Sequence, residues 1–251
     1  GERAPEPLVV EFAGVESGAQ TRGHRFSHDE SIEVRDIDEY RNRLAAADVV
    51  VDPDDRREEI VDELDDLSDE VGAEVVDDPG LVDEVVHLVE NPLATRLDFS
   101  DEYLELPDEV LETSMRSHQR YFAFRDPSSG ELTSHCGVIY NTPVHDPEVV
   151  NQGNLRVLRA RLDDAVFFWD NDRQRSLESR LGDLEEVVWL EQIGSMRARV
   201  ERMSELAGSI AEMRGADEDV RRDAQRAGLL AKSDLVTDMV DEFTDLQGVM
   251  G

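Results

Sequence analysis

Residues 155–169 read LRVLRARLDDAVFFW, and the chain changes character around this stretch. Its apolar residues recur every three or four positions, as on one face of a helix: Leu155, Leu158, Leu162, Val166 and Trp169. Phe167 and Phe168 lie off this stripe, so the helix is expected to be buried on more than one side or to pack on a further segment. The stretch therefore predicts a helix at the junction of two different regions.

Helical spacing continues from this stretch to the end of the chain. Two further apolar stripes predict helices there, one over residues 196–210 and one over residues 236–243. Strand signals are absent from this part of the sequence, which predicts an all-helical region.

Upstream of Pro147, strand and helix patterns alternate. Apolar runs predict strands at 8–12, 48–52, 73–76, 121–124 and 134–140, the last two joined by a turn at 126–130. Helical patterns occupy 36–47, 53–71 and 107–118, residues 81–89 form another helix or a buried segment, and residues 17–29 are expected to form a loop. The predicted fold class is α+β, with a mixed α/β domain over 1–150, connecting helices over 151–182 and a helical domain over 183–251.

The chain is strongly acidic and almost free of lysine. It has 26 Lys and Arg residues against 60 Asp and Glu residues, a formal net charge of −34, and Lys232 is its single lysine. This composition favours an organism that lives in concentrated salt, because about 1 M salt shortens the Debye length to roughly 3 Å and screens self-repulsion. In such a protein only local arginine clusters indicate contact with nucleic acid.

The acidic composition leads to a prediction about stability. We expect a higher melting temperature in about 2 M KCl than in about 0.1 M KCl, because salt screens repulsion between the carboxylates. Circular dichroism melts at the two concentrations measure this difference. Equal melting temperatures would contradict adaptation to salt.

Several classes of protein are excluded or disfavoured by simple counts. No run approaches the roughly 18 apolar residues that a membrane span needs. The single cysteine, Cys136, allows neither an internal disulfide nor a four-cysteine zinc site, so a reducing cytoplasm is expected. The chain begins at Gly1 without an initiator methionine or an apolar signal region, so we expect a segment of a longer protein.

Hydrolytic and metal-dependent chemistry finds weak support in the sequence. The dipeptides His28-Asp29 and His145-Asp146 lie in a polar loop and directly before a proline, not on converging helices that could hold a metal pair. The acidic residues 52–55 are typical of a helix start. Cys136 lies in a predicted strand, where its neighbour His135 points to the opposite face, so a core role is favoured. We expect no catalytic residue and no metal site.

Basic residues mixed with aromatic ones are the remaining candidates, and this mixture favours contact with RNA. Three groups are candidate RNA contacts, namely Arg22, His24 and Arg25; Arg116, His118, Gln119 and Arg120; and Arg156, Arg159 and Arg161. An ion pair between Arg159 and Asp163, four residues apart on a helix, is the alternative for the third group.

Lys232 is the single lysine of a chain that uses arginine at every other Lys or Arg position. If one helix runs from Leu229 to Phe243, the ammonium of Lys232 lies on an apolar face and needs a partner. If Asp234 instead caps a new helix, Lys232 is a connector residue. Both interpretations remain open from the sequence.

At these same positions the sequence resembles one family, the β subunit of the bacterial two-subunit glycyl-tRNA synthetase. Four ordered blocks carry the resemblance: TRGHRF (21–26); LELP (104–107) with Met115, His118, Gln119, Tyr121 and Phe122; GN (153–154) with VLRARL (157–162), DA (164–165) and FF (167–168); and KSDLVT (232–237) with MV (239–240), EF (242–243) and LQGVMG (246–251). Leu155 departs from the glutamate usual in the family, so no acid role is carried over to it.

The resemblance implies a B3/B4-like α/β domain followed by an incomplete helical HD-like domain. It implies that an α subunit uses ATP and Mg²⁺ to activate glycine, that this segment binds no cofactor, and that the subunits form an α2β2 heterotetramer with tRNA-Gly as ligand. The expected function is a non-catalytic segment that contacts the tRNA acceptor arm and supports subunit architecture, with Lys232 and Asp234 in a family motif. The alternatives are a hydrolytic module, either aminoacyl-tRNA editing or HD-type phosphohydrolysis, and a purely structural spacer.

Overall fold

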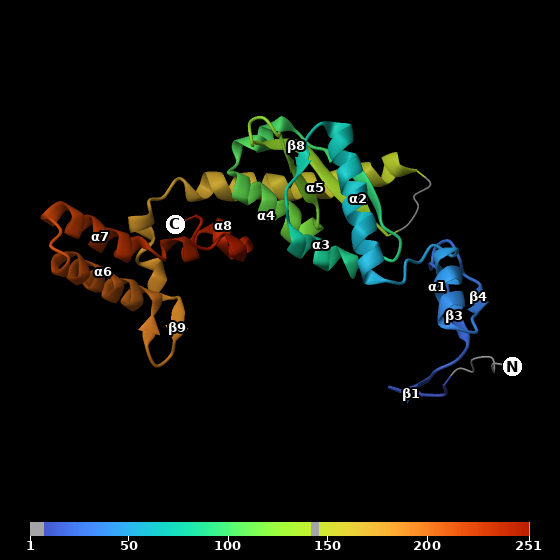
Figure 1. Ribbon diagram of the computed structural model, residues 1–251. Coiled ribbons are helices and arrows are strands. Elements are labelled where there is room, and N and C mark those ends of the chain that lie inside the picture. Colours follow the sequence, from blue (N-terminus) through green and yellow to red (C-terminus); the bar gives the residue numbers. More distant parts are fainter. Residues whose placement is uncertain (1–7, 142–145, 251) are drawn as a thin grey trace. The chain divides into compact units, whose positions relative to one another are not determined.

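The structure is a computed structural model that describes residues 8–141 and 146–250 (Figure 1). These residues form a mixed α/β fold of helices and small antiparallel sheets. The α-helices are α1 (Ile37–Ala45), α2 (Pro53–Val71), α3 (Pro79–Val86), α4 (Asp108–Gln119), α5 (Pro147–Asp172), α6 (Met196–Met213), α7 (Glu218–Leu230) and α8 (Asp238–Glu242). The strands are β1 (Glu11–Phe12), β2 (Val15–Glu16), β3 (Gln20–Arg22), β4 (Ser31–Glu33), β5 (Glu74–Val75), β6 (Leu93–Asp98), β7 (Phe122–Arg125), β8 (Leu132–Tyr140), β9 (Val188–Leu190) and β10 (Gly194–Ser195). Short 3-10 helices are η1 (Asp101–Glu105), η2 (Leu177–Arg180), η3 (Asp183–Glu185), η4 (Ser233–Val236) and η5 (Thr244–Leu246).

The chain divides into two compact units. Unit 1 comprises the described residues up to Asp101 together with His118–Val157, and unit 2 comprises Glu102–Ser117 together with the chain from Leu158 onward. Each unit therefore joins two separate stretches of sequence, whereas the domains expected from the sequence are continuous. The mixed α/β character predicted from the sequence is confirmed.

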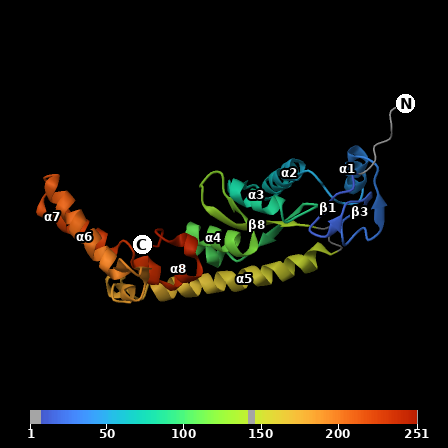
Figure 2. The same cartoon turned by 90° about the horizontal axis from the view of Figure 1, so that it is seen from below.

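Unit 1 is built on a four-stranded antiparallel sheet in the order β5-β7-β8-β6. β7 and β8 confirm the predicted hairpin, and Gly130 in its turn has the left-handed φ of 74° that glycine tolerates best. The edge strand β6 is not expected from the sequence. In Figure 2, α2 and α3 lie on one face of this sheet and the first turns of α5 follow the other face, where Asn151 Nδ2 donates to Thr95 Oγ1 (3.2 Å).

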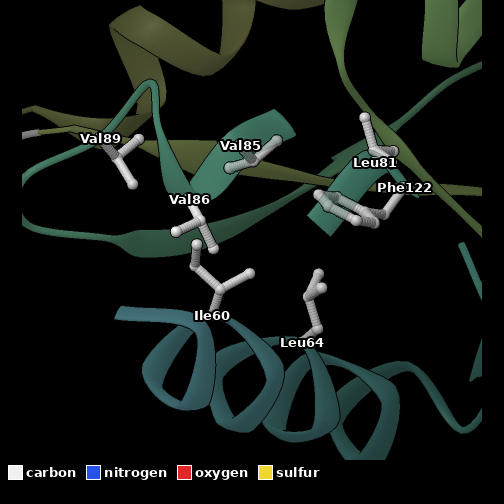
Figure 3. Packing of buried hydrophobic residues seen from close by; sticks show 7 residues of the cluster. All are labelled: Ile60, Leu64, Leu81, Val85, Val86, Val89 and Phe122. Carbon is white, nitrogen blue, oxygen red and sulfur yellow. The ribbon is translucent and has the colours of Figure 1, made fainter. Parts of the chain in front are cut away.

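The main apolar core of unit 1 lies between α2, α3 and the sheet (Figure 3). It consists of Ile60, Leu64, Leu81, Val85, Val86, Val89 and Phe122. Burying one such side chain contributes about 1.5–3 kcal/mol, so the apolar stripe of α2 is a main source of stability in this unit. Gly137 of β8 lets α2 approach the sheet, since a Cβ there would lie 3.1 Å from Leu64 Cδ2.

The ends of α2 are fixed by the residues that the sequence pattern indicates. Asp52 caps the helix by accepting the Asp54 N–H (3.2 Å), and Pro53 occupies the first turn, where its missing N–H costs nothing. Gly72 ends the helix with a φ of 67°. Residues 52–55 thus form a helix start, as predicted.

Two predictions for the first part of the chain are wrong, one of them only in part. The loop predicted over residues 17–29 is interrupted by β3, which pairs with β4, whereas residues 23–29 form no helix or strand. Residues 48–52, predicted as a buried strand, form no strand. Arg56 holds that stretch instead, because its guanidinium donates to the carbonyl oxygens of Val50 (2.6 Å) and Val51 (3.1 Å). A side chain thus takes the place that a neighbouring strand would have filled.

α5 confirms the predicted helix and extends it in both directions. Leu158 and Leu162 are fully buried, whereas Phe167 is 65% exposed, so the described residues do not bury α5 at Phe167. Packing of this side on a further segment stays a prediction. No described helix, α5 included, is long and apolar enough to cross a membrane.

In unit 2, α6 and α7 run side by side as a helical hairpin (Figure 1). Gly208 and Gly228 allow this approach, since a Cβ would lie 2.5 Å from Gln225 Nε2 at the first position and 3.0 Å from Met203 O at the second. The prediction of an all-helical region is wrong ahead of α6, where β9 and β10 form an antiparallel hairpin. The hairpin is too short to leave a clear period-2 pattern in the sequence.

The continuous helix considered for residues 229–243 is also wrong. α7 ends at Leu230, and η4 and α8 follow as separate short elements. Thr237, not Asp234, caps α8, because Thr237 Oγ1 accepts the Val240 N–H (3.2 Å). Lys232 therefore lies in the connector between α7 and η4.

A buried ion pair joins the end of α5 to the start of α8, and we call it the Arg180–Asp172 clamp. Arg180 is 4% exposed, and its guanidinium donates to Asp172 Oδ1 (2.9 Å), to the Asp172 carbonyl (3.0 Å) and to the Val236 carbonyl (3.0 Å). The Asp172 carboxylate also accepts the N–H groups of Asp238 (3.0 Å) and Met239 (2.9 Å). It thereby satisfies both the guanidinium and the open amides of a helix N-terminus.

Candidate nucleic-acid interface

The first candidate group lies at the end of β3 (Arg22) and on the loop that joins β3 to β4 (His24 and Arg25) in unit 1, and the shape of this loop depends on Gly23. A Cβ at this position would lie 2.5 Å from Ala47 Cβ, 2.8 Å from His28 Cβ and 2.9 Å from the Ala47 carbonyl oxygen. Any larger residue would push the loop away from the segment that follows α1. The close approach explains why a glycine stands between two long cationic side chains.

His24 holds this loop from inside. Its side chain is 0% exposed, its N–H donates to the Ala47 carbonyl (2.9 Å), and its carbonyl accepts the His28 N–H (2.8 Å). His24 Nδ1 accepts the Phe26 N–H (3.4 Å), and its Nε2 has no hydrogen-bond partner among the described residues. The structure therefore places His24 as a positioning residue of the loop, not on the surface that RNA would meet.

Arg22 and Arg25 are the exposed members of this group. Neither forms a salt bridge with any residue in the described part of the chain. Arg25 lies over the ring of Phe26, with its guanidinium carbon 5.4 Å from the ring centroid, and Phe26 is 74% exposed. A guanidinium beside an exposed aromatic ring offers both charge and a stacking surface to a nucleotide.

The second group lies at the C-terminal end of α4. Arg116 is exposed, whereas His118, Gln119 and Arg120 are half-buried. Arg120 ends the helix with a left-handed φ of 55°, and its Nε donates to Glu84 Oε1 on α3 (2.7 Å). The guanidinium of Arg120 is therefore already paired with a carboxylate within unit 1. Arg116 is the most accessible cation of the group.

The third group lies along α5. Arg156 and Arg159 are exposed and form no salt bridge within the described residues, whereas Arg161 faces Asp164 (3.6 Å) and Glu242 (3.8 Å). Asp163, the expected ion-pair partner of Arg159, accepts the Tyr103 hydroxyl instead (2.6 Å).

The surroundings of the Tyr103 hydroxyl raise its pKa. Burial and the hydrogen bond to Asp163 raise the pKa of Tyr103 to about 12, so it stays protonated and keeps donating to that carboxylate. This bond fixes η1 against α5 within unit 2, and it leaves Arg159 available to an external anion.

The motif around Lys232 and Asp234 has a structural role. Asp234 is 0% exposed, and its Oδ2 accepts the Gly248 N–H (2.6 Å). Its carbonyl accepts both the N–H (3.0 Å) and the hydroxyl (2.7 Å) of Thr237. Asp234 therefore ties the last described segment to the cap of α8. Lys232 is half-buried beside it.

The candidate nucleophile, Cys136, is not equipped for nucleophilic catalysis. Its side chain is 0% exposed on β8, and burial, together with the negative charge of Asp98, raises the pKa of the Cys136 thiol. Its neighbour His135 points to the other face, where its Nδ1 lies 2.7 Å from Asp98 Oδ1. The expected core role of Cys136 is confirmed.

This burial gives a prediction for thiol chemistry. We expect Cys136 to resist a disulfide-exchange reagent at pH 8 in the native protein and to react only as fast as the sheet opens, because the thiolate is the reactive form. The chain has one cysteine, so the absorbance of the released thiol reports this site alone. Protein unfolded in urea is the positive control, and rapid stoichiometric labelling of native protein would contradict the assignment.

No grouping of three or more His, Cys, Asp or Glu side chains that could hold a metal occurs within residues 8–141 and 146–250. Of the two His-Asp dipeptides, His28 pairs with Asp48 (Nδ1 to Oδ2, 3.4 Å) on the surface of unit 1. His145 lies outside the described residues.

Two arginine–tryptophan pairs in unit 2 were missed by the sequence reasoning. The guanidinium carbon of Arg173 lies 5.3 Å from the ring centroid of Trp169, and that of Arg199 lies 3.8 Å from the ring centroid of Trp189. The four-residue spacing on one helix could have revealed the first pair. The second depends on the β9–β10 hairpin, which the sequence does not indicate.

The candidates divide between the two units. Unit 1 holds Arg22, His24, Arg25, His118, Gln119, Arg120 and Arg156, and unit 2 holds Arg116, Arg159, Arg161, Lys232 and Asp234. The loop of unit 1 with Arg22 and Arg25 is the group whose charge and aromatic surface are both accessible.

The chain is similar in sequence to known proteins of one family. A family model described as "Glycyl-tRNA synthetase beta subunit" matches residues 5–251. Curated proteins described as "Glycine--tRNA ligase beta subunit" are similar over nearly the whole chain. Those from Phenylobacterium zucineum (42% identical over 248 residues, 98% of this chain and 37% of the relative) and Halothermothrix orenii (44% over 246 residues, 98% and 36%) are examples. The relative from Pseudoalteromonas translucida is 41% identical over 246 residues, covering 98% of this chain and 35% of the relative. The chain thus spans little more than a third of the length of these relatives.

Proposed function

The chain belongs to the glycyl-tRNA synthetase beta subunit family, and from this premise we propose that it is a non-catalytic segment of a glycine–tRNA ligase. Its role in the proposal is to contact tRNA-Gly at the acceptor arm and to support the architecture of the assembled enzyme. The observation that carries the proposal is the family match along residues 5–251 combined with the exposed, unpaired Arg22 and Arg25. These arginines keep their charge available in a chain of net charge −34.

The placement of the arginines supports an RNA contact. In a chain with 60 acidic residues, an arginine on the surface readily finds a carboxylate, as the many surface ion pairs show. Arg22, Arg25, Arg156 and Arg159 lie outside such pairs among the described residues. Unpaired guanidiniums are the groups that gain most from a phosphate, because each can form a bidentate, charge-assisted contact.

The hydrolytic alternative lacks a supporting observation. Cys136 is buried with a raised thiol pKa, and His24 lies inside its loop. A nucleophile must be accessible and activated by a neighbouring base, and neither residue meets this requirement.

The rest of the proposal concerns the longer protein. In it, ATP and Mg²⁺ are used by a partner α subunit, the subunits form an α2β2 assembly in the cytoplasm, and this segment corresponds to a B3/B4-like domain followed by part of an HD-like domain. The proposal also holds that the acidic, lysine-poor composition adapts the longer protein to concentrated salt.

Charge reversal of Arg22 and Arg25 tests the proposed contact. We expect Arg22→Glu and Arg25→Glu each to weaken binding of tRNA-Gly to the assembled two-subunit enzyme by about tenfold, because attraction to a phosphate becomes repulsion. The slope of log K against log salt should also become shallower by about 0.9 for each phosphate that is no longer neutralised. Filter binding at several salt concentrations measures both quantities.

Arg35→Glu is the matched control, since Arg35 is also exposed in unit 1 but lies outside the loop. The same loss of affinity in all three variants would show a diffuse charge effect. Unchanged affinity in the Arg22 and Arg25 variants would favour a structural spacer.

A further inference from the structure

A concave site in unit 2 is left unexplained by the interactions described above. It is a cavity of about 240 Å³ at the C-terminal end of α5, lined by Trp169, Asp172, Arg173, Arg175, Leu177, Arg180, Thr237, Met239 and Met250. We call it the Trp169 pocket. Its walls combine an indole ring and aliphatic side chains with three guanidiniums.

The charges in the Trp169 pocket do not cancel. Arg180 is neutralised by Asp172 in the clamp, and Arg175 Nη2 lies 2.9 Å from Asp183 Oδ2. Arg173 is exposed and forms no salt bridge with any residue of the described chain. One guanidinium without a salt bridge among the described residues therefore lines the pocket, with its carbon 5.3 Å from the ring centroid of Trp169.

The size and lining of the pocket indicate its ligand. The cavity is smaller than the roughly 300–1,000 Å³ of pockets that enclose drug-sized molecules. An inorganic anion alone would leave Trp169, Leu177 and Met239 without contact. A flat ring attached to a phosphate uses both kinds of wall, since bases stack on aromatic rings and on guanidinium planes.

We propose that the Trp169 pocket binds one unstacked nucleotide of RNA, with the base against the Trp169–Arg173 pair and the phosphate on the Arg173 guanidinium. The proposal rests on the proposed function and deepens it by naming a subsite in unit 2. The clamp holds the pocket open, because Asp172 and Arg180 line it and fix the start of α8.

Fluorescence of Trp169 tests this site directly. The chain has two tryptophans, so Trp189→Phe leaves Trp169 as the single reporter. A single-stranded RNA of about eight nucleotides should quench its emission in a saturable way, because a base stacks on the indole. Arg173→Ala in the same background should weaken binding by about tenfold. Arg173 is exposed, so its truncation removes its contact with Trp169 but leaves the buried residues of unit 2 in place.

Arg202→Ala is the matched control, since Arg202 is also exposed in unit 2 but does not line the pocket. The affinity of the Arg202→Ala variant for this RNA should stay within about twofold of the parent affinity. An equal loss in both variants would overturn the proposal, as would equal quenching by tripolyphosphate, which carries no base. Filter binding of the same RNA distinguishes failure of the pocket from failure of the proposed function. If the RNA is retained on the filter without any change in Trp169 emission, the pocket is refuted but the proposed function stands. Absence of retention by the chain and by the assembled enzyme refutes both.

Discussion

Replacing Asp172 by alanine is expected to lower the free energy of unfolding of unit 2 by about 3–5 kcal/mol. The substitution leaves the guanidinium of Arg180, which is 4% exposed, without its carboxylate. It also removes the acceptor for the Asp238 and Met239 N–H groups at the start of α8. A buried charge and two helix amides thus lose their partner at once.

Tryptophan fluorescence during urea unfolding measures this effect, because both tryptophans of the chain, Trp169 and Trp189, belong to unit 2. Glu201→Ala is the control, since it breaks the exposed pair with Arg197 and should change stability by less than about 1 kcal/mol. The double variant Asp172→Ala with Arg180→Met should be more stable than Asp172→Ala alone, because no unpaired charge remains buried. An Asp172→Ala variant as stable as the parent would show that the Arg180–Asp172 clamp contributes nothing to the stability of unit 2.

Replacing Gly23 by alanine is expected to destabilise the β3–β4 loop by about 1–3 kcal/mol. The new Cβ would lie 2.5 Å from Ala47 Cβ and 2.9 Å from the Ala47 carbonyl oxygen, so the loop must move away. That movement lengthens the hydrogen bond from the His24 N–H to Ala47 and displaces Arg22 and Arg25. Affinity for tRNA-Gly should therefore fall although no charge is changed.

Hydrogen exchange of the His24 amide measures the loosening of this loop, and filter binding measures its consequence. Gly18→Ala is the matched control, because no atom lies within 4 Å of a Cβ at that position. We expect Gly18→Ala to leave both quantities within about 0.5 kcal/mol of the parent. Slow exchange and full affinity in Gly23→Ala would contradict the role given to the loop.

Much of unit 1 could be predicted because its signals are local. Pro53 and Gly72 mark the ends of α2, and Gly130 marks the β7–β8 turn. A cap, a proline or a left-handed glycine leaves its mark within a few residues of sequence. The periodic stripes of α2 and α5 likewise depend only on local spacing.

The features that were missed depend on partners distant in sequence. β6 is a strand because β8 pairs with it across some forty residues, and residues 48–52 are held by Arg56 in place of a neighbouring strand. Glu102–Ser117 belongs to unit 2 although unit 1 surrounds it in the sequence. No local pattern records such pairings.

The candidate site was predicted in part for the same reason. The sequence indicated the loop with Arg22 and Arg25, since a glycine between cations is visible locally. It could not show that His24 is buried or that Asp163 binds Tyr103, because burial and hydrogen bonding are decided by tertiary structure. The Arg180–Asp172 clamp and the Trp169 pocket are likewise products of the folded unit.

Comparing glycine activation with tRNA charging tests most directly whether this chain handles RNA while the chemistry belongs to another polypeptide. In the assembled enzyme, the double variant Arg22→Ala with Arg25→Ala should raise the KM for tRNA-Gly by about tenfold or more. Glycine-dependent exchange of pyrophosphate into ATP, which needs no tRNA, should proceed at the parent rate. An unchanged KM for tRNA-Gly would contradict the RNA contact, and a fall in the exchange rate would contradict the assignment of the chemistry to another polypeptide.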